Sequence, residues 1–148
     1  MKSEPAEASI DDLASAPQQT LPRTGVRNYQ ARNFMRDAMH VGDGGLFYHS
    51  SCPEPGIVGL ARVVGRLQPD ATQFDAASPY FDPKATPERP RWVQLDVALV
   101  RKTRLLSLAE MRETPELATM QVLRRGNRLS ITPVSEAEWH AVLARLGG

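Results

Sequence analysis

The segment R-W-V-Q-L-D-V-A-L-V, residues 91–100, decides the fold because its apolar residues recur at every second position. Side chains of a strand point alternately to opposite faces, so this period predicts a strand in a sheet with one buried face. The alternating apolar positions are Val93, Leu95, Val97 and Leu99.

Three other segments also have strand character: LFYHS (46–50), GIVGLARVV (56–64) and RLSIT (128–132). Gly59, inside the second of them, predicts a bulge or a close backbone approach. Strands do not alternate with long crossover helices along the chain. We therefore expect an α+β fold with a mixed, mostly antiparallel sheet or small barrel and flanking helices.

Helix starts are marked by a Ser-x-x-acid spacing, in which hydroxyl and carboxylate satisfy free amides of the first turn. This spacing predicts helices near 10–15, 108–113 and 136–146; the pairs are Ser9 with Asp12, Ser107 with Glu110, and Ser135 with Glu138. Apolar residues at helical spacing predict a further amphipathic helix between Arg27 and Met39, capped by Asn28. Its apolar face holds Ala31, Phe34, Met35 and Ala38.

Residues 65–90 contain five prolines and no clear periodicity. A long loop inside a compact domain is usually functional or disordered. Three aromatic residues, Phe74, Tyr80 and Phe81, can anchor this segment against the body of the protein. We therefore expect an ordered loop.

The 148 residues fit one domain, spanning 1–148, and carry a formal net charge of +1. Of the 18 cationic side chains 15 are Arg, whose planar donors suit phosphates, carboxylates and base edges. Cys52, the single cysteine, favours a reducing, cytoplasmic setting. We expect no signal peptide and no membrane span, because apolar runs of the necessary length are missing. We also expect a monomer.

Signals for catalysis are weak. His49 and Cys52 lie three residues apart, and a thiol beside an imidazole can form a nucleophile. The spacing is more typical of chance neighbours in a turn, so we predict no catalytic residues, although a small Cys/His enzyme stays an alternative. We predict no metal, because Asp70, Asp75 and Asp82 lack the EF-hand spacing, and no cofactor, because nucleotide-binding motifs are missing.

Signals for recognition are stronger. Arg-rich stretches occur twice, at Arg23, Arg27, Arg32 and Arg36 and again at Arg124, Arg125 and Arg128. If the fold brings them together, they form a basic groove for a nucleic-acid backbone; otherwise they are two solvated faces. Recognition of a base would also need a concave pocket with aromatic faces and fixed donors. Candidates for it are Lys2, Ser3, Glu4, Tyr29, Asn33, Tyr48, His49 and Ser50.

Blocks along essentially the whole chain resemble the EVE-domain family, in the right order. They are KSEP (2–5), SIDDL (9–13), GVRNYQARNFMR (25–36), LFYHSSCPEPGIVGLARVV (46–64), FDAASPYFDPKATPERPRWVQLDV (74–97) and LRRGNRLSITPVSEAEW (123–139). The resemblance implies a PUA-like fold related to YTH domains, a curved mixed β-barrel flanked by short helices. It also implies a non-enzymatic DNA-binding module that reads a modified base, with methylated or hydroxymethylated cytosine favoured. An RNA-binding module of the YTH or PUA type is the alternative.

The resemblance also implies site residues. Those expected around the modified base are Lys2, Ser3, Glu4, Arg27, Asn28, Tyr29, Asn33, His49 and Ser50. Those expected to meet the phosphate backbone are Arg32, Arg36, Arg124, Arg125 and Arg128. This chain departs from the family pattern twice: Arg23 and Thr24 stand where a Trp and an acidic residue are usual, and the apolar residues usual before KSEP are missing, which predicts a short first strand.

Overall fold

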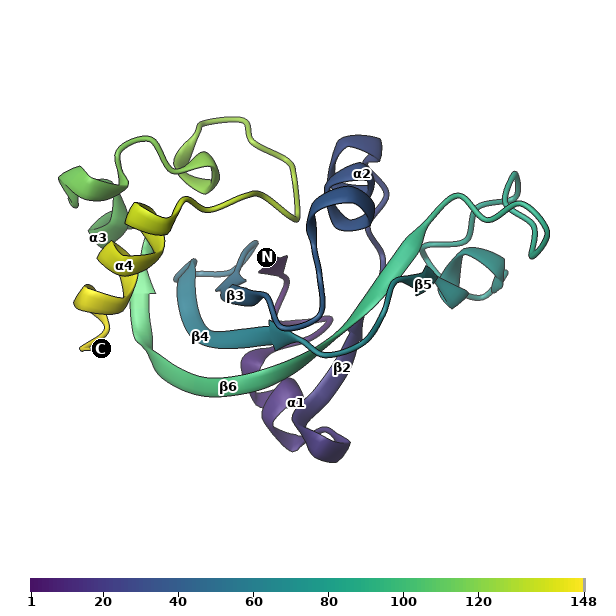
Figure 1. The fold of residues 1–148 in the computed structure, drawn as a ribbon, viewed down its shortest axis with the longest axis horizontal. Coiled ribbons are helices and arrows are strands. Elements are labelled where there is room, and N and C mark those ends of the chain that lie inside the picture. The colour runs from purple at the N-terminus through teal and green to yellow at the C-terminus, as the bar shows by residue number, and fades with distance from the viewer. Residues whose placement is uncertain (148) are drawn as a thin grey trace.

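A curved mixed sheet forms the centre of the computed structural model, which describes residues 1–147 (Figure 1). Neighbouring strands follow the order β1-β3-β4-β6-β2, and β5 also pairs with β6. The strands are β1 (Lys2–Ser3), β2 (Thr20–Arg23), β3 (Gly44–His49), β4 (Gly56–Val63), β5 (Gln68–Pro69) and β6 (Val93–Ser107). β1 runs parallel to β3, and the other pairs are antiparallel. The predicted fold class is confirmed.

β6 holds the sheet together, because its 15 residues pair with β2, β4 and β5 at successive positions. Leu95 and Val97 are almost fully buried, as their alternation predicted. Figure 1 shows β6 bending as one continuous ribbon from the β5 end to α3. This bend lets helices from both ends of the chain pack inside and around the sheet.

Gly59 occupies the close approach that its position in β4 predicted. The register of β4 against β6 shifts between Ile57 and Gly59. A Cβ atom at Gly59 would lie 2.6 Å from Cδ1 of Ile10 and 2.9 Å from the carbonyl oxygen of Arg101. Contacts this short exclude a side chain here, so the glycine lets α1 pack directly on the sheet.

The four predicted helices are all present: α1 (Ile10–Ser15), α2 (Tyr29–Ala38), α3 (Leu108–Arg112) and α4 (Glu136–Arg145). Ser9, Ser107 and Ser135 cap α1, α3 and α4, and Asn28 accepts hydrogen bonds from two amides at the start of α2. Single turns of 3₁₀ helix connect these elements at η1 (Pro17–Gln19), η2 (Ala71–Phe74), η3 (Pro115–Leu117) and η4 (Gln121–Leu123).

Two strand assignments differ from expectation. Residues 128–132 are not a strand; Asn127 accepts a hydrogen bond from the amide of Leu129, and the Ser130 carbonyl accepts one from the amide of Lys2. The segment thus crosses the start of β1 with irregular backbone. β2 was not predicted, because it is four residues long and contains Pro22, which gives no alternating pattern.

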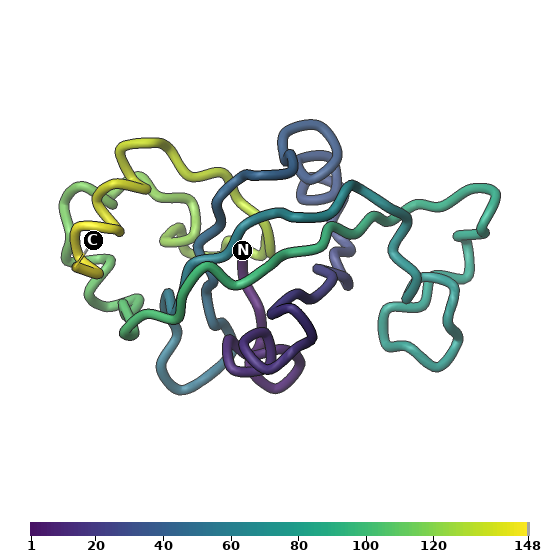
Figure 2. Tube along the Cα trace, turned by 60° about the horizontal axis from the view of Figure 1, so that its bottom comes forward, coloured from purple at the N-terminus to yellow at the C-terminus, as the bar shows by residue number. Residues whose placement is uncertain are grey.

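The loop between β5 and β6 is ordered, and Figure 2 shows it projecting from one end of the sheet. Its main anchor is the fully buried Gln73, whose amide bonds to the backbones of Asp70, Arg91 and Trp92. Phe81, expected as an anchor, is 41% exposed. Tyr80, another expected anchor, packs against Gly25, so a buried amide satisfied by backbone groups and one aromatic ring together anchor the loop.

Candidate nucleic-acid interface

A cavity of about 470 Å³ lies beside the first strand, and we call it the N-terminal cavity. Five parts of the chain contribute to it: the first seven residues, the end of β2 with Gly25, the turn after β3, the β5–β6 loop and the segment after η4. It is lined by Lys2, Ser3, Glu4, Glu7, Arg23, Gly25, Ser50, Ser51, Tyr80, Asn127, Arg128 and Ser130. Its walls are therefore mainly polar, with one aromatic ring.

Backbone bonds of β1 hold the N-terminal residues against the turn after β3 and against the segment after η4. The amide of Ser50 donates to the carbonyl of Ser3 at 3.0 Å, which fixes the chain after β3 beside the KSE segment. On the other side of β1, the amide of Lys2 donates to Ser130 at 2.8 Å, and Lys2 Nζ donates to the carbonyl of Asn127 at 3.1 Å. The arginine-rich turn thus lies directly against the N-terminal segment.

Arg23 lies between these walls at the end of β2. Its terminal nitrogens donate to the carbonyls of Thr24 and Lys2, at 2.8 and 2.9 Å. Its Nε is buried and has no hydrogen-bond partner among residues 1–147. Burial lowers the pKa of Arg23, although Tyr80, Glu7 and Asp70 act in the opposite direction. This guanidinium has no carboxylate within ion-pair distance among the described residues.

Tyr80 forms the aromatic wall. Its hydroxyl donates to the carboxylate of Glu7 at 2.6 Å, and burial, followed by this carboxylate, raises its pKa to about 12. Gly25 has a φ of +79°, and a Cβ atom there would lie 2.9 Å from the Tyr80 ring. Both the backbone conformation and the close approach of the ring require glycine at this position.

Arg27 is tied into the protein interior and does not line the N-terminal cavity. Its guanidinium donates to Asp70 at 3.0 Å, to Thr72 at 3.1 Å and to the Tyr80 carbonyl at 2.8 and 3.0 Å. Asp70 is fully buried and also accepts from the amide of Gly25. The Gly-Val-Arg-Asn motif is therefore a clamp that holds α2 to the β5–β6 loop and positions Tyr80.

The neighbouring residues of α2 also lie outside the N-terminal cavity. The side-chain oxygen of Asn28 accepts the hydrogen bonds that cap the helix. Tyr29 stacks on Trp92 with ring centroids 4.8 Å apart. Asn33 accepts two hydrogen bonds from Arg32, and Arg36 pairs with Asp37. None of these predicted site residues lines the N-terminal cavity together with the KSE segment.

His49 points away from its predicted partner Ser50. Alternation along β3 sends the His49 ring toward α1, where Nε2 accepts a hydrogen bond from the amide of Ile10 at 3.0 Å. Burial lowers the pKa of His49, which favours the neutral ring that this acceptor role needs. With Nε2 accepting, the proton lies on Nδ1, so neither nitrogen is free to act as a base toward Cys52.

The residues that the structure gathers are therefore Lys2, Ser3, Glu4, Ser50 and Arg128, while Arg124 and Arg125 are exposed on the same turn. Sequence reasoning missed Glu7, Tyr80, Asn127 and Ser130. The only indication in the sequence that Glu7 belongs to the cavity was its closeness to the KSEP block. Tyr80 carried a stronger signal, because an aromatic residue in a proline-rich loop needs a surface to cover.

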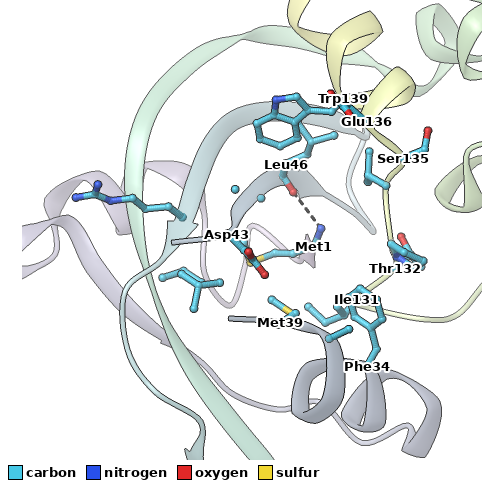
Figure 3. Close-up of a pocket in the computed structure, with 18 residues that line it drawn as sticks. Met1, Phe34, Met39, Asp43, Leu46, Ile131, Thr132, Ser135, Glu136 and Trp139 are labelled. Carbon is cyan, nitrogen blue, oxygen red and sulfur yellow. Dashed lines mark hydrogen bonds between the residues drawn. The ribbon is translucent and has the colours of Figure 1, made fainter. Parts of the chain in front are cut away.

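A larger cavity of about 680 Å³ lies between α2 and α4 (Figure 3). The residues that line its interior, including Met1, Phe34, Ile131 and Trp139, are mostly apolar. A third cavity, of about 430 Å³, shares Ser3, Glu7, Arg23 and Tyr80 with the N-terminal cavity. Both are more apolar in their lining than the N-terminal cavity, whose polar groups suit the edge of a base better.

Within residues 1–147 no group of three or more His, Cys, Asp and Glu side chains is arranged to hold a metal ion. In the same range, no helix combines the length and apolar character needed to cross a membrane.

Comparison with known proteins identifies the family. The model of the EVE domain matches residues 1–145. Human thymocyte nuclear protein 1 is 42% identical over 97% of this chain and 71% of its own length, and the chicken protein of that name is 43% identical over 92% and 59%. The crystal structure of the human THYN1 protein in complex with 5-methylcytosine-containing DNA has a TM-score of 0.93 and 41% identity, covering 100% of this chain and 96% of the other. This chain belongs to the EVE-domain family.

Proposed function

We propose that this protein binds DNA containing a modified cytosine, holds the modified base in the N-terminal cavity and performs no catalytic step. The observation that carries the proposal is the N-terminal cavity itself, a concave polar site on a fold shared with a protein solved on 5-methylcytosine-containing DNA. The related protein is similar over the full length of this chain, so the same elements are available to build a site.

The N-terminal cavity has the chemistry that a base requires. At about 470 Å³ its volume falls within the range of roughly 300–1,000 Å³ common for small-ligand pockets. Lys2 and Arg23 supply donors, Glu4 and the serine hydroxyls supply acceptors, and the Tyr80 ring supplies a flat surface for stacking. A base turned out of its stack can be read on its edge by such groups.

The arginine-rich turn supports contact with the backbone. Arg128 borders the N-terminal cavity, and the neighbouring Arg124 and Arg125 are exposed. Within residues 1–147, none of the three has a carboxylate partner within ion-pair distance. Phosphates neighbouring a base in the cavity would provide the missing counter-charges.

The hydrogen bond at His49 supports a binding role without catalysis. A Cys52 nucleophile would need an imidazole nitrogen that can accept its proton. Nε2 is already engaged by the amide of Ile10. The enzyme alternative would regain support if Cys52→Ser abolished a measured turnover.

The test is a binding titration with labelled DNA duplexes that differ at one cytosine, carrying hydrogen, methyl or hydroxymethyl at carbon 5. We expect tighter binding of a modified duplex, and loss of that preference in Tyr80→Leu with folding checked by thermal melting. Arg128→Gln should weaken all duplexes alike and reduce the salt slope by about 1. Equal affinity of the wild-type protein for all three duplexes at low salt would refute the proposal.

Competition with RNA of matched sequence distinguishes the proposed DNA-binding function from the RNA-binding alternative. RNA and DNA of the same sequence differ by the 2′-hydroxyl, which the protein can contact in RNA alone. We expect the RNA to compete less well than modified DNA. If RNA displaces modified DNA at equal or lower concentration, the ligand class is RNA.

A further inference from the structure

A column of stacked groups runs from the surface of α2 to the wall of the N-terminal cavity. The guanidinium carbon of Arg32 lies 4.5 Å from the centroid of the Tyr29 ring, and Tyr29 stacks on Trp92. The guanidinium carbon of Arg32 also lies 5.9 Å from the Trp92 centroid, and that of Arg27 lies 5.3 Å from the Trp92 centroid and 5.5 Å from the Tyr80 centroid. The column connects an exposed aromatic ring with the ring that lines the cavity.

The outer end of this column, Tyr29, Arg32 and Arg91, is called the Tyr29 platform here. Tyr29 is 49% exposed, and its hydroxyl accepts a hydrogen bond from Arg91 at 3.3 Å. Arg32 donates to the side-chain oxygen of Asn33 and to the Arg91 carbonyl, which are neutral groups. Two guanidinium groups therefore flank an exposed ring.

The charge of the Tyr29 platform is not balanced locally. In the described part of the chain, no carboxylate lies within 4.0 Å of the guanidinium nitrogens of Arg32 or Arg91. The carboxylate of Asp82 accepts a hydrogen bond from the Trp92 indole at 2.8 Å, and this bond, together with the charge of Arg91, lowers the pKa of Asp82. Nearby Asp37 is paired with Arg36. An anionic partner would supply the missing negative charge.

The chemistry of the Tyr29 platform fits nucleic acid. Arginine planes bind phosphates, and exposed aromatic rings with adjacent arginines stack on bases. We propose that the Tyr29 platform is a second contact surface, which binds the backbone of the same nucleic acid a few nucleotides from the base in the N-terminal cavity. This inference rests on the proposed function, because that function supplies the bound strand.

The contacts along the column limit the distance between the Tyr29 platform and the N-terminal cavity. Its contact distances place the Tyr29 ring no more than about 16 Å from the Tyr80 ring, roughly the length of five stacked nucleotides at about 3.4 Å each. A single strand passing out of the N-terminal cavity can therefore reach the Tyr29 platform within about five nucleotides.

A double-mutant cycle between protein and DNA tests the inference. A duplex of about 20 base pairs carries one modified cytosine, with neutral methylphosphonate linkages placed about five nucleotides away on either side in turn. For wild-type protein we expect one of the two placements to weaken binding about fivefold. For Arg32→Gln/Arg91→Gln the same placement should have no further effect, because the charge that it removes no longer has a partner.

Arg112→Gln is the matched control, because Arg112 is an exposed arginine at the end of α3 that lines none of the three cavities. In this variant the neutral linkages should keep their full fivefold effect. Equal losses in the wild type and in the double variant would overturn the inference. A wild-type protein without preference for the modified cytosine would instead refute the proposed function, while a surviving coupling would keep the Tyr29 platform as a contact surface.

Discussion

Arg23 and Arg27 are four residues apart, and the structure gives them opposite environments. Arg27 bonds to Asp70, Thr72 and the Tyr80 carbonyl, and its guanidinium stands over two aromatic rings. Arg23 donates to two backbone carbonyls, lines the N-terminal cavity and leaves its buried Nε without a partner in residues 1–147.

This difference separates a structural arginine from a candidate ligand contact. A guanidinium whose donors are satisfied stabilises the fold and has little left to offer a ligand. A guanidinium with an unsatisfied donor beside a cavity loses free energy in the unbound protein and can recover it when an acceptor arrives. Changes at Arg27 should therefore affect stability first, and changes at Arg23 should affect binding.

The largest effect is expected at Arg27. Arg27→Met removes the partner of a fully buried carboxylate, which should lower the free energy of unfolding by about 3 kcal/mol. Urea denaturation measures this change. Arg36→Met, which breaks an exposed pair on α2, is the control and should leave the denaturation midpoint almost unchanged.

Asp70→Asn in the Arg27→Met background should recover part of that loss, because it removes the unpaired buried charge. If Arg27→Met unfolds at the same urea concentration as the wild-type protein, the clamp does not contribute to stability and the comparison fails.

A smaller effect is expected from Arg23→Trp, which places an aromatic ring between two cavities of about 430 and 470 Å³. Stacking on a base contributes about 1–3 kcal/mol, so affinity for a modified-cytosine duplex should rise about tenfold. Arg23→Met is the control, since it is apolar but has no ring. Equal affinities of the Trp and Met variants would show that the ring does not meet a base.

The smallest effect concerns acid stability. Burial opposes ionisation of Asp70, but hydrogen bonds from Thr72, Gly25 and Arg27 outweigh it and lower its pKa. A lowered folded-state pKa means that the stabilisation is complete above the ordinary carboxyl pKa and is lost as the pH falls toward the folded-state value.

Between pH 5 and pH 3.5, the wild-type protein should therefore lose about 0.5 kcal/mol more unfolding free energy than Asp70→Asn, as measured by urea denaturation at each pH. Parallel pH profiles for the two proteins would contradict the lowered pKa of Asp70.

Much of the fold could be predicted because its signals are local. The β6 alternation and the serine caps each depend on neighbours within a few residues, and both are confirmed. The close approach at Gly59 is also confirmed; a glycine inside a strand indicated it, although the groups that approach belong to the distant Ile10 and Arg101. The segment 128–132 looked like a strand, but its edge has no strand partner; the backbone bond to Lys2 shapes it instead. β2 needed β6 to form, because four residues with a proline have little strand preference of their own.

The candidate site was harder to predict because its geometry depends on distant partners. The resemblance to the EVE-domain family implied that the KSE segment and Ser50 lie around one base, and the β1–β3 pairing that brings them together was not predicted. Tyr29 and Asn33 share a motif with Arg27, yet Tyr29 stacks on Trp92, Asn33 bonds to Arg32, and neither lines the N-terminal cavity. A motif groups residues by sequence, whereas a cavity groups them by position in space.

The sequence by itself determined the periodicity of the strands and helices, the helix caps and the family, because each of these depends on residues close together in the chain. The tertiary structure alone decided which arginine is satisfied. The partners of Arg27 lie 43 and 53 positions away, at Asp70 and Tyr80, and both belong to the loop between β5 and β6. Arg23, four residues earlier, meets the first strand at the edge of the N-terminal cavity and keeps an unpaired donor.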